Sequence, residues 1–184
     1  PVLVKESSFG YHVGGSAGLA PLSNVDRVDY SNDTSRAATR GPLSGQRYYP
    51  AGNSSSTHAY FAGGAAPGEV STIDRIDYSN DTAATAIKGP LTVATNMFAG
   101  SGTVDFGYFA GGTPGPLSTV NRIEYANDSV VAVVKGPLST GASHVSGAGN
   151  QSHGFFSSYA YGKSTVDRLD YSSDSTACVT KGPR

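Results

Sequence analysis

The chain has 184 residues, with 13 basic and 14 acidic side chains and a formal net charge of −1 at pH 7. This balance leaves no basic surface for nucleic acid or for an anionic membrane, so we expect neither partner. No stretch approaches the roughly 20 apolar residues of a membrane-spanning helix, and the sequence therefore predicts no membrane insertion. The single cysteine, Cys178, excludes an internal disulfide and a cysteine-rich zinc site.

One sequence pattern occurs four times, at a spacing of about 46 residues. Each copy contains an aromatic run, a segment that reads hydrophobic–Asp/Asn–Arg–hydrophobic–acid–Tyr, a turn, and a basic residue followed by Gly-Pro. The units cover residues 1–49, 50–97, 98–144 and 145–184. A period of this size is typical of a propeller blade or a solenoid unit. Abundant Gly and Pro between short β-favouring segments predict one all-β repeat domain.

The first predicted strand of the pattern is the aromatic run. It ends at two glycines, which let the backbone turn or approach another strand closely. The glycine pairs are Gly14 and Gly15, Gly63 and Gly64, and Gly111 and Gly112, and the fourth unit lacks one. A loop of variable length follows, residues 16–24 in the first unit and 65–72 in the second. Variable loops on a repeated frame commonly carry binding sites, so these loops are the predicted recognition surface.

The next predicted strands cover residues 25–30, 73–78, 120–125 and 166–171. Ser, Asn and Asp side chains after each strand bond to their own backbone, which predicts hairpin turns such as residues 31–34. A returning strand, for example residues 130–134, leads to Gly-Pro, where proline ends the hydrogen bonding. A further strand, for instance around residues 96–100, gives four antiparallel strands per unit.

Four antiparallel strands with a double glycine after the second resemble a kelch-type β-propeller blade, although the kelch tryptophan is absent from every unit. Tyr-Phe-Ala-Gly-Gly at 60–64 and Ser-Thr-Ile-Asp-Arg-Ile-Asp-Tyr-Ser-Asn-Asp-Thr at 71–82 are similar to kelch-like repeats of tail-fibre-type structural proteins of marine bacteriophages. The resemblance implies β-propeller-type blades and a structural role outside a cell or on a virion.

Closure of a ring is the open question for four units, because propellers contain about four to eight blades. Pro1 aligns with Pro50, before the first strand of a unit, and Pro183 ends the last strand of another. The chain is thus cut between units, and no strand is shared between its ends to close a ring. We expect self-association or further blades of a longer chain rather than a monomeric ring.

Acidic pairs at each predicted turn have part of a calcium-loop spacing. The pairs are Asp29 and Asp33, Asp77 and Asp81, Glu124 and Asp128, and Asp170 and Asp174. The glycine and the distal glutamate of a calcium loop are missing, and turn capping explains the same residues. We therefore predict no metal ion and no other cofactor.

An arginine recurs in each acid–Tyr strand, two residues before an acid on the same strand face. These arginines are Arg27, Arg75, Arg122 and Arg168. They predict buried ion pairs within or between blades. A ring of arginines that holds an anionic ligand is the alternative, and the near-zero net charge favours pairing.

A flat ring recurs just before each aromatic run, at Phe9, His58, Phe106 and His153. Packing is the expected role of this position, rather than metal binding or catalysis. Five asparagines open glycosylation sequons, which would matter only in a eukaryotic secretory pathway. They are Asn32, Asn53, Asn80, Asn127 and Asn150.

The leading functional hypothesis is a non-enzymatic, extracellular or virion structural and adhesion protein. Its recognition loops would bind a glycan or a cell-surface protein. The alternative is a lectin with one weak sugar site per blade, in which Tyr48, Tyr49 or Tyr161 stacks on the sugar. A fragment of a kelch-type copper oxidase is less favoured, because Cys178 has no histidine near it in sequence.

Overall fold

The computed structural model describes residues 8–158 and 165–183, which form antiparallel β-sheets joined by turns. The first sheet contains β1 (Phe9–Val13), β4 (Val25–Asp29) and β5 (Ala38–Thr39), beside the hairpin of β2 (Ser16–Ala17) and β3 (Ala20–Pro21). The second contains β6 (Ala51–Ser54), β7 (His58–Ala62), β8 (Ile73–Asp77) and β9 (Ala86–Lys88). The third contains β10 (Ala99–Gly102), β11 (Phe106–Ala110), β12 (Val120–Glu124) and β13 (Val133–Lys135). The fourth contains β14 (Val145–Gly149), β15 (His153–Ser158), β16 (Thr165–Asp170) and β17 (Val179–Pro183).

The all-β expectation is confirmed, and each sheet uses the strands of one sequence unit in chain order. The first sheet differs, because the described residues contribute three strands to it rather than four. Within the part of the chain that the structure describes, no helix is long and apolar enough to cross a membrane.

The same register holds in all four sheets. In each, the residue at the centre of the aromatic strand lies opposite the repeated arginine. The pairs are Tyr11 and Arg27, Tyr60 and Arg75, Tyr108 and Arg122, and Phe155 and Arg168. Residues at matching positions of different units can therefore be compared directly.

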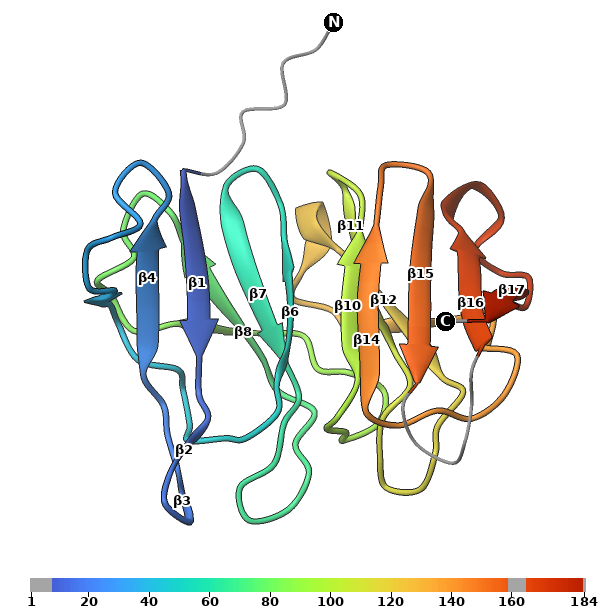
Figure 1. The fold of residues 1–184 in the computed structure, drawn as a ribbon, viewed down its shortest axis with the longest axis horizontal. Helices are drawn as coiled ribbons and strands as arrows, with labels where there is room; N and C mark the ends of the chain where they lie inside the picture. The colour runs from blue at the N-terminus through green and yellow to red at the C-terminus, as the bar shows by residue number, and fades with distance from the viewer. Residues whose placement is uncertain (1–7, 159–164, 184) are drawn as a thin grey trace, which may run out of the picture.

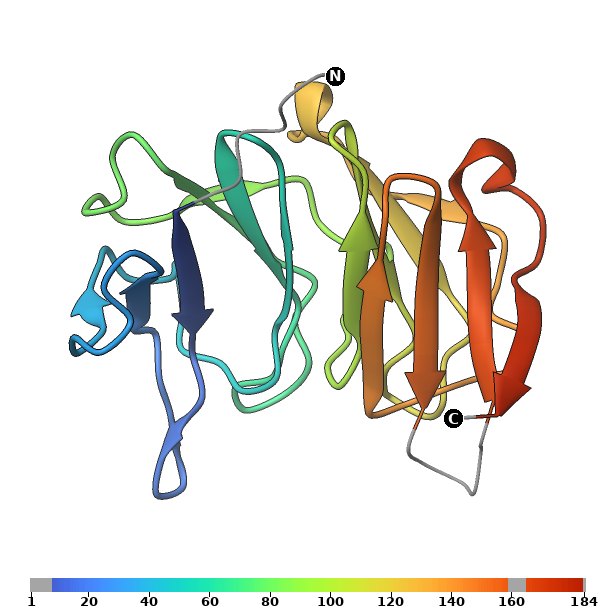
Figure 2. The same ribbon diagram turned by 45° about the horizontal axis from the view of Figure 1, so that its top comes forward.

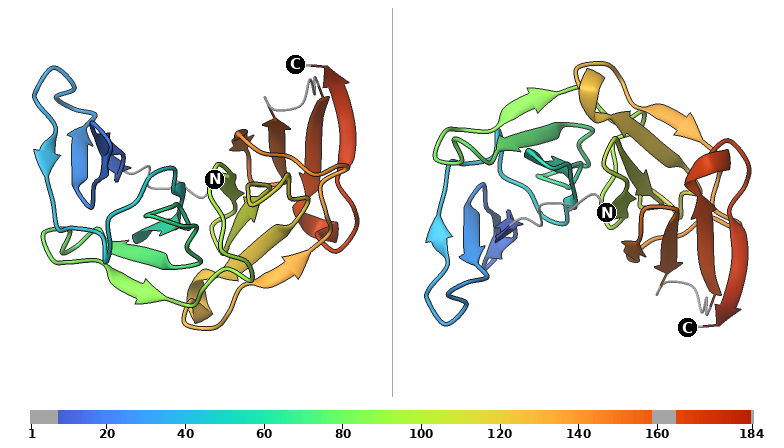
Figure 3. Two further views of the ribbon diagram at one scale, coloured as in Figure 1. Left: turned by 90° about the horizontal axis from the view of Figure 1, so that it is seen from below. Right: turned by 90° about the horizontal axis from the view of Figure 1, so that it is seen from above.

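The four sheets follow one another along an arc (Figures 1 and 2). Seen along the strands, the arc is open on one side, with the first sheet at one end and the fourth at the other (Figure 3). Neither end sheet contacts the other, so each presents one face that no described sheet covers.

The hydrophobic core lies between the sheets rather than inside any one of them. One cluster joins the second sheet to the third through Tyr60, Ile73, Phe98, Phe109 and neighbouring residues, all buried. Equivalent clusters join the first sheet to the second and the third to the fourth. Since burial depends on a neighbouring sheet, each unit is stable only as part of the array.

The returning strand is shorter than its sequence predicts. Residues 130–134 were expected as a strand, whereas β13 begins at Val133, and both Val130 and Val131 are more than half exposed. The Asp128 carbonyl accepts from the Gly89 amide at 2.8 Å, and the Ala132 amide donates to Pro90 at 2.9 Å. Residues 128–132 therefore form backbone hydrogen bonds with the preceding sheet, and only from Val133 onward does the chain pair with a strand of its own sheet.

Candidate functional site

The connections that vary between units lie along one edge of the arc, at the bottom of Figure 1. The β2–β3 hairpin belongs to this edge, as do the loops that follow β7 and β11. The segments that lead from one sheet to the next reach the same edge, because strands run antiparallel. Variation in sequence length is therefore concentrated on one surface.

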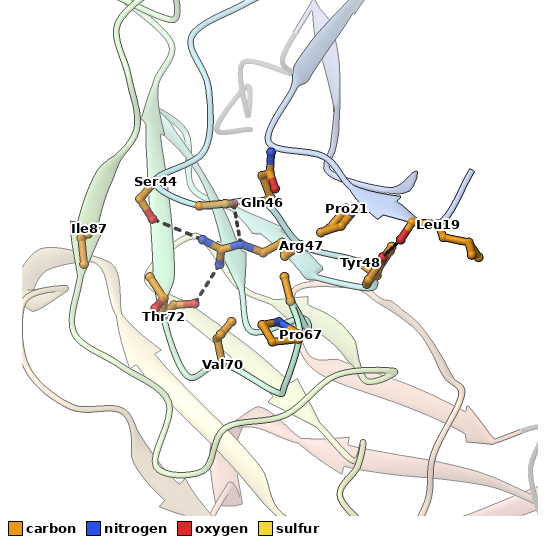
Figure 4. Close-up of a pocket in the computed structure, with 12 residues that line it drawn as sticks. Leu19, Pro21, Ser44, Gln46, Arg47, Tyr48, Pro67, Val70, Thr72 and Ile87 are labelled. Carbon is orange, nitrogen blue, oxygen red and sulfur yellow. Dashed lines mark hydrogen bonds between the residues drawn. The ribbon is translucent and has the colours of Figure 1, made fainter. Parts of the chain in front are cut away.

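A groove of about 740 Å³ opens on this edge between the first two units (Figure 4). The β2–β3 hairpin, the 44–48 connection and the 66–72 loop form its walls, and Ile87 of β9 completes them. Apolar side chains predominate in this lining. They are Leu19, Pro21, Ala66, Pro67, Val70 and Ile87.

Arg47 is the single charged residue in the groove lining, and its charge is neutralised from within. Its side chain is 3 % exposed and forms an ion pair with Asp74, whose side chain is fully buried. Its Nη1 donates to the carbonyls of Gly63 at 3.2 Å and Thr72 at 3.4 Å. A guanidinium with these partners has little capacity left for a ligand. The groove therefore presents an uncharged surface.

Two of the three tyrosines expected to recognise a ligand, Tyr48 and Tyr49, lie at this groove or beside it. The Tyr48 hydroxyl donates to the Leu19 carbonyl, which ties the β2–β3 hairpin to the 44–48 connection (Figure 4). Tyr49 is 58 % exposed, and its ring centroid is 6.0 Å from that of Tyr48. Tyr161 lies outside the described residues. Leu19, at the tip of the hairpin, is 95 % exposed.

Tyr49 has φ +53°, in the left-handed region that a non-glycine residue seldom adopts. Met97 and His144, the last residues of the second and third units as Tyr49 is of the first, have the same conformation. The strained residue thus recurs where the chain enters each following sheet.

Three of the four repeated arginines, Arg27, Arg75 and Arg122, form the expected ion pairs, and their partners are acids of the next sheet rather than the acids two residues away on the same strand. Arg75 Nη1 lies 2.8 Å from Asp128 Oδ2, Lys88 Nζ lies 3.1 Å from Asp128 Oδ1, and the Tyr60 hydroxyl donates to Oδ2 at 3.0 Å. We call this contact, in which a tyrosine and two cations of one sheet surround an aspartate of the next, the inter-sheet joint. Equivalent joints surround Asp81 with Tyr11, Arg27 and Arg40, and Asp174 with Tyr108, Arg122 and Lys135.

Two further interactions accompany each inter-sheet joint. The tyrosine ring stacks on the acid–Tyr residue of the next unit, and the centroids of Tyr60 and Tyr125 are 4.8 Å apart. The glycine of Gly-Pro also lies against the next turn, where a Cβ on Gly89 would be 1.8 Å from the Val130 carbonyl oxygen. Side chain, ring and backbone therefore all cross the boundary between sheets.

The two acids of each pair considered for calcium have different roles: the second acid of the later pairs belongs to an inter-sheet joint, whereas the first lies at its own turn. Asp77 accepts from the amide of Ser79 at 2.8 Å and from its hydroxyl at 2.7 Å, so it caps its own turn. Asp29 and Asp170 do the same with Ser31 and Ser172. Among residues 8–158 and 165–183, no group of three or more His, Cys, Asp or Glu side chains is arranged to hold a metal ion.

Electrostatics in the joints follows from burial and charge. Burial disfavours the charged form of Asp128, but hydrogen bonds from Lys88, Tyr60 and Arg75 outweigh this and lower its pKa. Burial raises the pKa of Tyr11 to about 12, and the nearby Asp81 carboxylate acts in the same direction. Asp128 is therefore charged and Tyr11 neutral at neutral pH.

The glycine pairs directly follow β1, β7 and β11, and all six glycines have positive φ. A Cβ on Gly64 would lie 2.6 Å from the Tyr48 carbonyl oxygen. Its amide donates to Thr95 of the connection that leads to the next sheet. The glycines therefore allow the variable loop to pack against that connection.

The flat-ring position packs with the repeated arginine in two units. The Arg27 guanidinium lies 4.0 Å from the Phe9 ring centroid, and that of Arg122 lies 4.5 Å from the Phe106 centroid. His153 Nε2 is 3.8 Å from Asp170 Oδ2.

Cys178 is buried, and burial raises the pKa of its thiol to about 11. It is therefore a protonated thiol at neutral pH.

Sequence reasoning missed Arg47 and Leu19, the residues that shape the groove. Neither residue recurs in the other units. The Arg47 carbonyl accepts from the second glycine of the first pair, and the residues that do the same in the next two units are Thr95 and Ala142. Their departure from the repeat is the signal that could have identified them.

In comparisons with known proteins, no family model matches the chain and no curated protein shows significant similarity to it.

Proposed function

We propose that this chain is a non-enzymatic structural and binding module made of kelch-like, propeller-type blades. Its variable loops recognise the partner, and the groove between the first two units is the principal contact. One observation carries this proposal: the repeated arginines of the first three units are engaged in inter-sheet joints, whereas the non-repeated residues expose an uncharged, largely apolar groove.

The partner's chemistry follows from this lining. An uncharged groove does not compensate the desolvation of an ionic ligand, so it selects a neutral one. Exposed Leu19, Ile87 and Tyr49 offer apolar contact around it, with fractional exposures of 95 %, 66 % and 58 %. A neutral glycan, or an uncharged and partly apolar segment of a cell-surface protein, fits this description.

An extracellular or virion location belongs to the same proposal. The resemblance of the repeats to phage tail-fibre proteins supports it. The inter-sheet joints support it as well, because a rigid array held by repeated bonds suits a fibre or a knob.

A lectin is the second candidate, favoured by the pair Tyr48 and Tyr49. An exposed tyrosine held by a fixed neighbour offers a flat surface on which a sugar ring can stack at small entropic cost. In this case the groove edge would bind the glycan face, and affinity would come from several units.

The test is binding of labelled protein to an array of neutral and charged glycans and, in parallel, to a panel of intact bacterial cells. We expect binding to a neutral target that Leu19→Asp and Tyr49→Ala each reduce about tenfold or more. Val104→Asp, in the β10–β11 turn on the opposite edge, is the matched control and should bind as the wild type does. Cell binding without glycan binding would remove the lectin candidate. Binding unchanged in both groove variants would overturn the proposal.

A further inference from the structure

The two ends of the arc carry complementary, unfilled halves of the inter-sheet joint. Each internal aspartate of the joint is at most 8 % exposed, because the preceding sheet covers it. Asp33 occupies the same position in the first unit, is exposed, and has no ion-pair partner among the described residues. Tyr30, its neighbouring acid–Tyr residue, is 62 % exposed, whereas the matching Tyr78 is partly buried.

The donor half is unfilled at the other end. Arg168 matches Arg27, Arg75 and Arg122, yet no carboxylate of the described residues lies within ion-pair distance of it. Its Nε is buried without a hydrogen-bond partner. Lys181 occupies the position of Lys88 and Lys135 and is exposed. Gly182 matches Gly89, but nothing lies within 4 Å of a Cβ built on it.

We propose that the fourth sheet of one copy docks on the first sheet of a second copy through this joint. Arg168 and Lys181 of one copy would hold Asp33 of the other, and Phe155 would stack on Tyr30. Gly182 would lie against the backbone at Ser35, as Gly89 lies against Val130. Opposite charges at the two ends make the contact heterologous, joining the head of one copy to the tail of the next.

Two copies are the expected number. A heterologous contact leaves one open half at each end of any unclosed assembly. Two four-sheet arcs joined at both ends leave none and give eight sheets, at the upper end of the range of about four to eight blades in propellers. The inference goes beyond ligand recognition and does not depend on the groove.

This contact is more polar than the internal ones. His12 is exposed and lies opposite Asp26, where Phe61, Phe109 and Phe156 are buried opposite the matching residues. Phe155 also lacks the hydroxyl that Tyr60 donates to Asp128. Ion pairs therefore contribute a larger share of the binding, and the assembly should weaken as salt concentration rises.

The decisive test uses native mass spectrometry and sedimentation of the full chain. The wild type should give twice the mass of the chain, and Asp33→Arg should give the monomer because it places a cation against Arg168 and Lys181. Asp105→Arg alters an exposed carboxylate in the β10–β11 turn and should leave the dimer unchanged. Arg168→Asp should also be monomeric.

Mixing distinguishes this contact from any other. Equal amounts of Asp33→Arg and Arg168→Asp should form a dimer, because one joint then has reversed charges and the other is wild type. Gly182→Ala provides a second test if Arg168→Asp folds poorly. The added methyl meets no atom within 4 Å in the isolated chain, but it would collide with the second copy, so this variant should be monomeric. Phe155→Tyr should tighten the dimer by restoring the hydroxyl donor.

Three results would overturn the inference. They are a wild-type chain that stays monomeric at the highest concentration reached, a dimer that Asp33→Arg and Gly182→Ala leave intact, and a mixture of the two charge variants that does not associate. Circular dichroism of each variant confirms that a lost dimer is not a lost fold.

Discussion

Arg75 of the second sheet and Asp128 of the third form an ion pair of 2.8 Å across the boundary between two repeats. The same bond joins Arg27 to Asp81 and Arg122 to Asp174 at the same distance. The repeated charges therefore fix the stacking of the sheets, and four predictions follow from this arrangement and from the groove.

Replacing Asp128 by alanine should lower the free energy of unfolding by about 2–4 kcal/mol, because Arg75 and Lys88 would be left partly buried without a counter-ion. Chemical denaturation measures this change. Asp105→Ala, at an exposed position, should cost less than about 0.5 kcal/mol. Equal costs for the two variants would contradict the role assigned to the joint.

Acid should weaken the array. The folded pKa values of Asp128 and Asp174 are lowered below the ordinary 3.8, in each case because hydrogen bonds from the tyrosine and lysine outweigh burial. Carboxyls with lowered pKa values contribute stability above the unfolded value, and this contribution is lost as pH falls through the folded value. Unfolding free energy should therefore decline below about pH 4.

Asp128→Asn provides the check on that decline. The variant has no carboxyl to titrate at this joint, so its stability should depend less on pH between about 2 and 5 than that of the wild type. Parallel curves for the two proteins would show that other groups cause the acid sensitivity.

Gly89→Ala should destabilise the fold by about 2–4 kcal/mol, because its Cβ would lie 1.8 Å from the Val130 carbonyl oxygen and force two sheets apart. Thermal unfolding gives the comparison. Gly45→Ala is the matched control, since nothing lies within 4 Å of a Cβ at that position. A neutral effect at Gly89 would mean that the sheets can shift without cost.

Arg47→Leu should destabilise the fold by about 3–5 kcal/mol, because the fully buried Asp74 would lose its counter-ion. Arg36→Leu removes an exposed arginine and should change stability by less than about 0.5 kcal/mol. Hydrogen exchange should also rise in the 63–72 loop, whose Gly63 and Thr72 carbonyls Arg47 holds. Wild-type exchange in that loop would contradict this role.

The sequence alone determined the all-β class, the four units and the turns, because these depend on short-range properties. Glycine at positive φ after β7 and the Ser79 bonds to Asp77 involve residues next to one another in the chain. Such local reasoning predicted ion pairs of the arginines within or between blades but could not choose between the two, and the structure shows pairs between sheets. Asp77 is the nearest acid to Arg75, but its carboxylate is already used by its own turn.

Only the tertiary structure decided which residues cross between sheets. Arg75 and Asp128 are 53 residues apart, and their contact requires the second and third sheets to be stacked in register. The groove likewise depends on Leu19, Arg47 and Pro67 of two units, none of which belongs to the repeated pattern. A repeat specifies the same local structure in each unit. The contacts of its end sheets and of its non-repeated residues are decided only by how the units pack against one another.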